Sequence, residues 1–342
     1  MSNQKSTLSN MNILRVFGIS LVVLRHAFAP FTDSWNLSVL YEYNMVADFI
    51  GKYISTLSMP LFVFISGYTF SFLRNYLNKY HTYSILLEKK TRRLFLPYIV
   101  FALLYIYFFK EYSNVSEFLL PLWEGSGHLW FLLMIFILFI IFYPLESFFK
   151  KNITAGLVIA ILCYFLVLPV HYLNLNPLAH VFKYFIFFYI GYLFRFKNDL
   201  ILKRIHNKTA LLVVIHLALF STYFYLLKQS EDIYYTSVVN QMLLILGVIS
   251  VTFAYSIINS ILNHSFFNKP TVNKTVKIIN DNSYYVYIFH QPILILLYST
   301  LFFQKLHIAI VIILGFIISF VLALFFGYIF ISTKIGRKLI GS

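Results

Sequence analysis

The stretch IAIVIILGFIISFVLALFFGYIFIS, residues 308–332, carries no charged side chain. An α-helix rises about 1.5 Å per residue, so roughly 20 such residues cross the ~30 Å hydrocarbon core of a bilayer. Similar apolar runs recur along the whole chain, and we therefore expect an all-α, polytopic membrane protein with about ten transmembrane helices. The further runs are Ile13–Phe31, Val46–Phe72, Leu94–Phe109, Leu129–Tyr143, Ile153–Val170, Val181–Phe194, Thr209–Leu227, Val238–Leu262 and Tyr284–Phe302.

The composition agrees with a membrane protein and excludes other classes. Of the 342 residues, 60% are hydrophobic and 11% are charged, whereas soluble domains average about 45–50% apolar and about 25% charged residues. A net charge of +15 would favour nucleic-acid binding in a soluble protein. Here the basic residues form no continuous stripe and the sequence contains no nucleic-acid motif, so we expect no nucleic-acid partner.

The sequence offers no pattern for a metal site or a disulfide framework. The one cysteine, Cys163, lies inside an apolar run. Zinc-type His-x-x-x-His spacing and paired intramembrane carboxylates are absent from the sequence. We expect neither a metal nor a permanently bound cofactor.

Lysines and arginines mark one side of the membrane. Basic clusters such as Lys89–Arg93, Lys150–Lys151 and Lys334–Lys338 follow even-numbered runs, whereas most acidic residues follow odd-numbered runs. The positive-inside rule then predicts that both termini are cytoplasmic. The connections are short and leave no room for a soluble accessory domain, so we expect residues 1–342 to form one membrane-embedded domain.

Three ionisable residues interrupt the first run, and such residues are functional candidates because they are costly inside a span. Arg15 and His26 are eleven residues apart, so they share one helix face at a separation of ~16 Å, whereas Arg25 points about 100° away. This spacing predicts a cation at the cytoplasmic mouth of a groove and an imidazole deep in the membrane. Alternatively, Arg15 snorkels to the interface and His26 satisfies a buried carbonyl. Asp48 is the one acid near the edge of a run that could approach His26.

Three other polar stretches interrupt the apolar runs. Ser66-Gly67 permits close helix contact, which favours a packing notch over a catalytic serine. His128, two residues before Trp130, either lines an external opening or caps the fourth run at the interface. His290 lies about 10 Å from the cytoplasmic end of the ninth run.

A basic cluster, Lys89, Lys90, Arg92 and Arg93, stands immediately before the third run. Retention on the cytoplasmic side explains these charges without a function. The alternative is a clamp for a ligand that carries several phosphate charges, because arginine pairs bind phosphate bidentately.

Taken together, these stretches resemble acyltransferase family 3, the integral-membrane O-acyltransferases that modify bacterial surface glycans. The resemblance covers essentially the whole chain in the family's order. It is carried by Arg15–His26, Pro60–Gly67, Lys89–Pro97, His128–Phe131 and His290–Pro292. The arginine and histidine that open the first span at an Arg-x10-His spacing are its most specific feature.

The resemblance implies a core that takes an acyl group, usually acetyl, from cytoplasmic acyl-CoA to a sugar hydroxyl. By position, His26 would be the catalytic histidine and Arg15 its supporting charge. The basic cluster matches the pair that the family associates with the CoA donor. Lysine stands here where the first member of that pair is arginine, which leaves open which side chains contact phosphate. Candidates for the substrate path are Ser66, His128, Trp130 and His290.

The function expected from the resemblance is an O-acyltransferase of the bacterial cytoplasmic membrane. It would move acetyl, or succinyl as in some members, to a cell-surface polysaccharide such as a capsule or exopolysaccharide, or to its lipid-linked precursor. The partners expected are acyl-CoA, the glycan acceptor, membrane lipid and other glycan-synthesis membrane proteins. One alternative is a polysaccharide or lipid-linked sugar exporter, against which stands the lack of inverted-repeat signals. A catalytically inactive scaffold is a third possibility.

Overall fold

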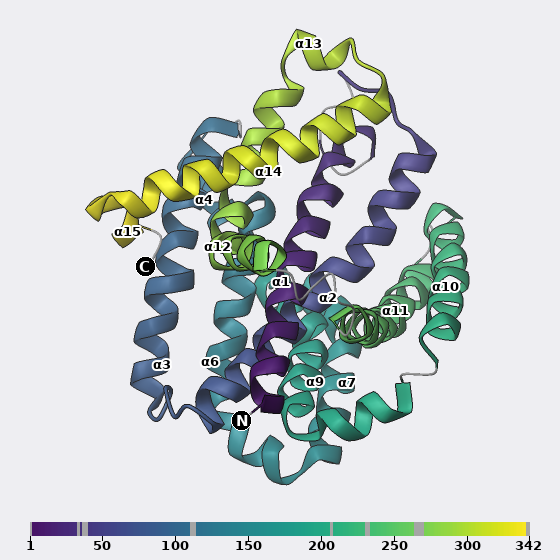
Figure 1. Cartoon of the computed structure of the whole chain (residues 1–342). Coiled ribbons are helices and arrows are strands. Elements are labelled where there is room, and N and C mark those ends of the chain that lie inside the picture. The colour runs from purple at the N-terminus through teal and green to yellow at the C-terminus, as the bar shows by residue number, and fades with distance from the viewer. Residues whose placement is uncertain are drawn as a thin grey trace. The chain divides into compact units, whose positions relative to one another are not determined.

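A computed structural model describes residues 2–32, 35, 40–109, 114–205, 208–229, 233–262 and 270–339. Within these ranges the regular structure is helical and contains no strand (Figure 1). The expected all-α fold class is therefore confirmed. The elements are α1 (Ser2–Ala27), η1 (Ala29–Phe31), α2 (Met45–Asn75), α3 (Tyr83–Lys90), η2 (Thr91–Phe95), α4 (Leu96–Phe109), α5 (Val115–Glu124), η3 (Gly127–Leu129), α6 (Trp130–Lys151), α7 (Ile153–Phe165), α8 (Val167–Tyr172), α9 (Asn176–Ile205), α10 (Thr209–Gln229), α11 (Ile233–Leu262), α12 (Pro270–Tyr298), α13 (Leu301–Gln304), α14 (Ile308–Ser332) and α15 (Lys334–Leu339).

Several of these helices are long and apolar enough to cross a membrane, so the chain is a multi-pass membrane protein. Among the described residues there are seven, namely Met45–Asn75, Tyr83–Phe109, Gly127–Lys151, Asn176–Arg195, Thr209–Gln229, Val238–Ile257 and Ile308–Ser332. The other three expected runs fall in α1, α7 and α12. Helix α7 has 13 residues, and α1 and α12 carry polar residues that lower their mean hydropathy. The count of ten and the cytoplasmic termini stay predictions.

The chain divides into two compact units. The first comprises Met1–Ile65 and Lys197–Tyr328, and the second comprises Ser66–Phe196 and Ile329–Ser342. The expectation of one membrane-embedded domain stays a prediction.

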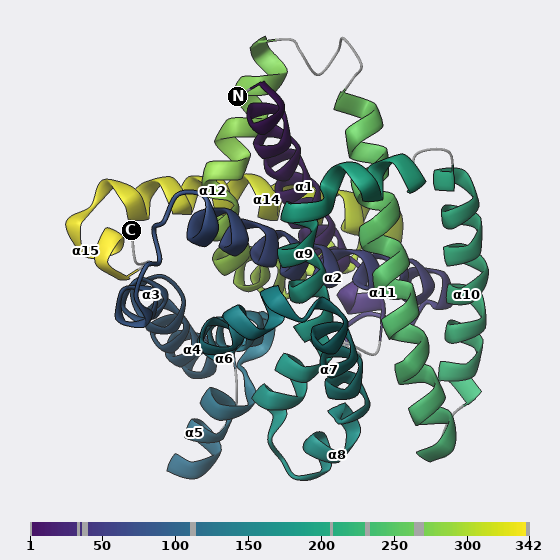
Figure 2. The ribbon, with the colours of Figure 1, turned by 90° about the horizontal axis from the view of Figure 1, so that it is seen from below.

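In the first unit, α1 packs along α12 and also contacts α11, while α10 packs against α11 (Figure 1, Figure 2). Aromatic rings fill the contact between α10 and α11, and Phe49 and Tyr53 of α2 reach the same cluster. Such packing stabilises helices in lipid, where the hydrophobic effect does not drive them together. The buried members of this cluster are Phe220, Tyr223, Phe224, Val239 and Leu246.

A buried polar contact joins α2, α10 and α11 in the same unit. His216 and Ser250 are both buried, and Ser250 Oγ lies 2.9 Å from His216 Nε2. The same hydroxyl lies 3.0 Å from the backbone carbonyl of Thr56, and His216 Nδ1 lies 3.3 Å from the Tyr53 hydroxyl. Because unpaired polar groups are costly in an apolar interior, these contacts fix the register of the three helices.

A buried carboxylate anchors the second unit. Glu146 on α6 accepts hydrogen bonds from Arg74 Nε at 2.8 Å, Asn75 Nδ2 at 2.9 Å and the Tyr192 hydroxyl at 2.9 Å. Buried charges are stable only when paired and hydrogen-bonded. The network therefore ties α6 to α2 and α9, and it assigns Arg74 a structural role.

Gly67 allows α2 to approach α9 closely within the second unit. A Cβ atom at Gly67 would lie 2.0 Å from the backbone carbonyl oxygen of Phe188. Only glycine permits that separation between two helix backbones. The packing notch expected at Ser66-Gly67 is confirmed, and a place for Ser66 in the substrate path stays a prediction.

The third helical span begins earlier than the apolar run suggests. We expected Leu94–Phe109 after a cytoplasmic loop, but the span is continuous from Tyr83 to Phe109 through α3, the π-helical turn η2 and α4. Thr82 caps its first turn by accepting a hydrogen bond from the Ile85 amide at 3.4 Å. The charges of the basic cluster end the apolar run, but they do not end the helix.

We predict that Gly67→Ala destabilises the protein by about 1–3 kcal/mol, because overpacking at this contact forces two backbones apart. Gly18→Ala is the matched control, since its Cβ would meet only the edge of the Phe62 ring, at 3.1 Å, and that ring can move aside. Thermal unfolding of the detergent-solubilised protein measures both effects. Equal melting temperatures for Gly67→Ala and the wild type would contradict the close contact.

Candidate active site

Contacts between polar side chains join α1 to α12 at two levels in the first unit. Arg15 Nη1 donates a hydrogen bond to Asn280 Oδ1 at 2.8 Å, and His26 Nδ1 lies 3.0 Å from His290 Nε2. Residue numbers rise in the same direction along both helices, so α1 and α12 run parallel. Arg15 and His26 both face α12, as their eleven-residue spacing predicts, and this shared face is confirmed. Their roles in catalysis stay predictions.

The two imidazoles are held by their own helix backbones as well as by each other. The ring centroids are 4.9 Å apart, with the planes inclined at 52°. His290 is completely buried, and its Nδ1 lies 2.9 Å from the carbonyl oxygen of Val286 and 2.8 Å from that of Tyr287. His26 is partly buried, and its Nδ1 lies 2.9 Å from the carbonyl oxygen of Val22.

The sequence left open that His26 only satisfies a backbone carbonyl, and the structure shows such a contact with Val22. The atom of His26 that makes this contact is Nδ1, which also contacts His290. Both of these contacts are made by the same ring nitrogen. A contact to a carbonyl and a catalytic role are therefore compatible in the same imidazole.

Asp48, which the sequence suggested as a possible neighbour of His26, is engaged by other residues of the first unit. Its buried carboxylate pairs with Lys52 and lies 3.0 Å from Lys228 Nζ. It also accepts a hydrogen bond from the Tyr43 hydroxyl at 3.0 Å. Opposite charges on the next helical turn and on α10 hold this acid, and the neighbour that the structure gives His26 is His290.

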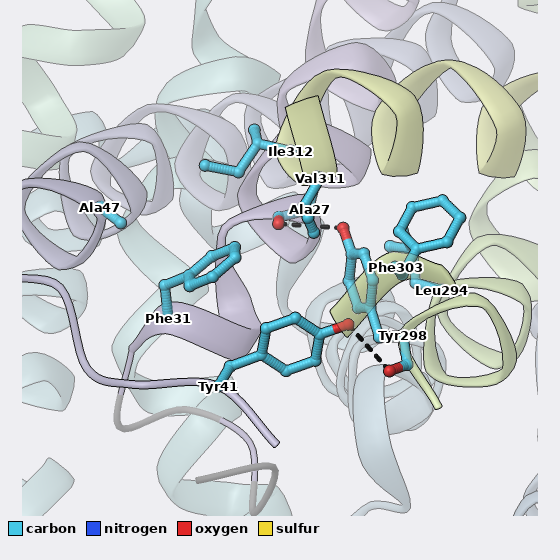
Figure 3. Packing of buried hydrophobic residues seen from close by; sticks show 9 residues of the cluster. All are labelled: Ala27, Phe31, Tyr41, Ala47, Leu294, Tyr298, Phe303, Val311 and Ile312. Carbon is cyan, nitrogen blue, oxygen red and sulfur yellow. Dashed lines mark hydrogen bonds between the residues drawn. The ribbon is translucent and has the colours of Figure 1, made fainter. Parts of the chain in front are cut away.

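A hydrophobic cluster packs around the end of α1 and the second half of α12 (Figure 3). The Tyr298 hydroxyl donates to the carbonyl oxygen of Ala27 at 3.0 Å, and the Tyr41 hydroxyl donates to the Tyr298 carbonyl at 2.9 Å. Burial raises the pKa of Tyr41 to about 12, so this hydroxyl remains a donor at neutral pH. The residue next to His26 is thus fixed against α12. The cluster consists of Ala27, Phe31, Tyr41, Ala47, Leu294, Tyr298, Phe303, Val311 and Ile312.

Trp35 adds an aromatic ring beside the histidine pair. Its ring centroid lies 6.0 Å from that of His26, with the planes inclined at 25°, and 6.3 Å from that of Tyr298. No sequence pattern indicated Trp35 or Asn280 as candidate site residues. Trp35 lies in a connection with no motif around it, and Asn280 lies in a polar stretch that precedes the apolar part of α12.

The basic cluster lies in the second unit and divides into two environments. Lys89, Arg92 and Arg93 are exposed, and Arg92 forms an ion pair of 2.9 Å with Glu88 on the preceding turn. Lys90 instead packs among rings, with its Nζ 3.5 Å from the ring centroid of Phe139. Three of the four side chains are therefore exposed, and the fourth is enclosed by aromatic rings.

His128 and Trp130 also belong to the second unit. His128 is buried in η3, just before α6, and its ring centroid lies 6.2 Å from that of Tyr105. Trp130 stacks on His180, with the centroids 4.5 Å apart and the planes inclined at 30°. A place for either residue, or for Ser66, in a substrate path stays a prediction. Within the described ranges, His, Cys, Asp and Glu side chains form no group of three that could hold a metal ion.

We predict an energetic coupling of about 1.5–3 kcal/mol between Arg15 and Asn280, the range expected for a hydrogen bond to a charged group. Arg15→Ala, Asn280→Ala and the double variant form a double-mutant cycle, read by thermal unfolding in detergent. Asn282→Ala is the matched control, because its amide bonds the carbonyl of Ile278 on its own helix. Additive effects of Arg15→Ala and Asn280→Ala would contradict the contact.

The sequence profile of a family described as an acyltransferase domain matches residues 8–332. The match covers nearly the whole chain, including both helices of the histidine pair and the basic cluster. No curated protein and no solved structure matches the chain. The family match and the apolar helices agree on a membrane-embedded enzyme. The chain belongs to acyltransferase family 3 and is a multi-pass membrane acyltransferase.

Proposed function

We propose that this acyltransferase moves an acyl group, acetyl or succinyl, from acyl-CoA to a hydroxyl of a cell-surface polysaccharide or its lipid-linked precursor. The observation that carries the proposal is the contact between His26 on α1 and His290 on α12. It fixes the orientation of an imidazole, the side chain best suited to exchange a proton near neutral pH. Capsule and exopolysaccharide are acceptors of the required chemistry.

In the proposed reaction His26 is the general base. Its Nε2 takes the proton of the sugar hydroxyl as the oxygen attacks the thioester carbonyl carbon. The C–S bond then breaks, the new ester remains on the sugar, and the CoA thiolate takes the proton from the imidazolium. General acid–base catalysis of this kind contributes about 10²–10⁴-fold to the rate. The guanidinium of Arg15, held by Asn280, would supply positive charge at the entry of the donor.

The basic cluster would bind the phosphates of the CoA donor. The exposed side chains of Lys89, Arg92 and Arg93 support this role, since guanidinium and ammonium groups form charge-assisted hydrogen bonds with phosphate. Lys90 would support the cluster from its place against Phe139. Acyl-CoA enters as a substrate in this scheme, and the proposal needs no resident cofactor.

The remaining candidates, Ser66, His128 and Trp130, would line the path of the acceptor. His290 leaves the substrate path in this proposal, because it is completely buried and its nitrogens face carbonyl groups and His26. Membrane lipid surrounds the enzyme, and other glycan-synthesis proteins of the same membrane would supply the acceptor.

The proposed topology has ten crossings of the bacterial cytoplasmic membrane. Because α1 and α12 run parallel, an odd number of crossings must separate them. Six long apolar helices lie between them in the sequence, and α7 would be the seventh. Adding α1, α12 and α14 makes ten and places both termini on one side, which the distribution of basic residues predicts to be the cytoplasm.

We predict that His26→Ala abolishes acyl transfer while the protein is still inserted in the membrane. The test compares the mass of the surface glycan from cells that carry the wild type, no protein, or His26→Ala. The wild type should add the mass of an acyl group, and the other two should lack it. Full acylation with His26→Ala would refute the role of His26, and loss of extracellular glycan with unchanged acylation would favour an exporter.

Replacing Arg92 and Arg93 together by Gln should raise the KM for acyl-CoA by about 10–100-fold. A change of this size is expected even if the two residues together contribute a single net charge-assisted hydrogen bond to phosphate. The kcat should change little, because phosphate contacts are equally strong in the ground and transition states. Lys90→Gln serves for comparison and should have a smaller effect. An unchanged KM in the double variant would show that the donor binds elsewhere.

A further inference from the structure

We propose that His290 is a positioning residue that keeps the proton of His26 on Nδ1 and so leaves the Nε2 lone pair as the base. The inference rests on the proposed function for its catalytic meaning. The arrangement of protons in the pair follows from the backbone carbonyls beside the two Nδ1 atoms and from the contact between the two rings.

The backbone of α12 decides where His290 carries its proton. Its Nδ1 lies within 2.9 Å of two carbonyl oxygens, those of Val286 and Tyr287. A carbonyl oxygen can only accept, so Nδ1 must be an N–H donor. In the neutral imidazole the other nitrogen, Nε2, then carries a lone pair and is an acceptor.

For His26, the backbone of α1 and the ring of His290 together determine which nitrogen carries the proton. Its Nδ1 lies 2.9 Å from the carbonyl oxygen of Val22 and 3.0 Å from Nε2 of His290. A lone pair on this nitrogen would face two acceptors, which is repulsive. His26 therefore also carries its proton on Nδ1, shared between the Val22 carbonyl and His290. Any group that bonds His26 Nε2 must donate, as a sugar hydroxyl does.

Proton uptake by His26 strengthens this arrangement. When Nε2 takes the proton of the hydroxyl, the ring becomes positive and its Nδ1–H becomes a stronger donor to His290. The carbonyl dipoles of Val286 and Tyr287 polarise His290 from its far side and stabilise the charge on the pair. Backbone dipoles would thus perform the orienting task that a carboxylate performs in Ser-His-Asp triads.

The proton arrangement is tested on the purified protein, without substrate, by NMR with ¹⁵N-labelled histidine. We expect a directly bonded proton on Nδ1 of both residues and a scalar coupling between His26 Nδ1 and His290 Nε2 across the hydrogen bond. His26→Gln and His290→Gln assign the signals, and each should remove the coupling. A proton on Nε2 of His26 would overturn the inference.

The positioning role is tested by the release of free CoA from acetyl-CoA, in membrane vesicles of cells that make the glycan. We expect His290→Ala to lower kcat by on the order of 10²-fold with an unchanged KM for acetyl-CoA, an effect typical of residues that orient a functional group. His290→Gln should recover part of the loss, because its amide oxygen can accept the His26 proton. An unchanged kcat in His290→Ala would overturn the role.

The matched control is His216→Gln, which removes another fully buried histidine of the same unit. Its partners are Tyr53 and Ser250, so we expect a lower melting temperature with an unchanged kcat. If His290→Ala does not fold, the kcat of His290→Gln and the NMR coupling decide the question. Vesicles of the wild type that release no CoA would refute the proposed function, while the NMR result would still decide the proton arrangement.

Discussion

The structure of the first unit depends on the parallel contact between α1 and α12. Polar groups inside a membrane need partners within the protein, because lipid offers none. This contact supplies partners at two levels, Arg15 with Asn280 and His26 with His290. The aromatic cluster around Tyr298 then closes the end of the contact and fixes the backbone beside His26. A small shift of either helix would break both polar contacts at once.

Carboxylates and imidazoles have different tasks in this protein. Asp48 and Glu146 are buried. Two lysines and a tyrosine hydroxyl hold Asp48, and an arginine, a tyrosine hydroxyl and an amide hold Glu146. Such networks fix helices in place and leave the acid little freedom to act as a base. The imidazole of His26 is held by a carbonyl and by a second imidazole. This arrangement would orient the proposed base without burying another carboxylate in the membrane.

The two units contribute different parts of the proposed reaction. The first holds the proposed base and its proposed positioning residue, and the second holds the exposed basic side chains proposed for the CoA phosphates. The family match extends across both units. In the second unit, the close approach at Gly67 and the network at Glu146 join α2, α6 and α9. Local rigidity of this kind suits a donor site on a single continuous helix, Tyr83–Phe109.

The sequence by itself determined the membrane class, the all-α fold and the shared face of Arg15 and His26, because apolar run length and helical periodicity are local properties. It misplaced the start of the third span, since charged side chains end an apolar run without ending a helix. The tertiary structure alone decided the partners. His290 is 264 residues from His26 in the chain, and Asp48, which is near His26 in sequence, is taken by lysines. Which polar groups meet depends on how distant helices pack, and no local pattern encodes that choice.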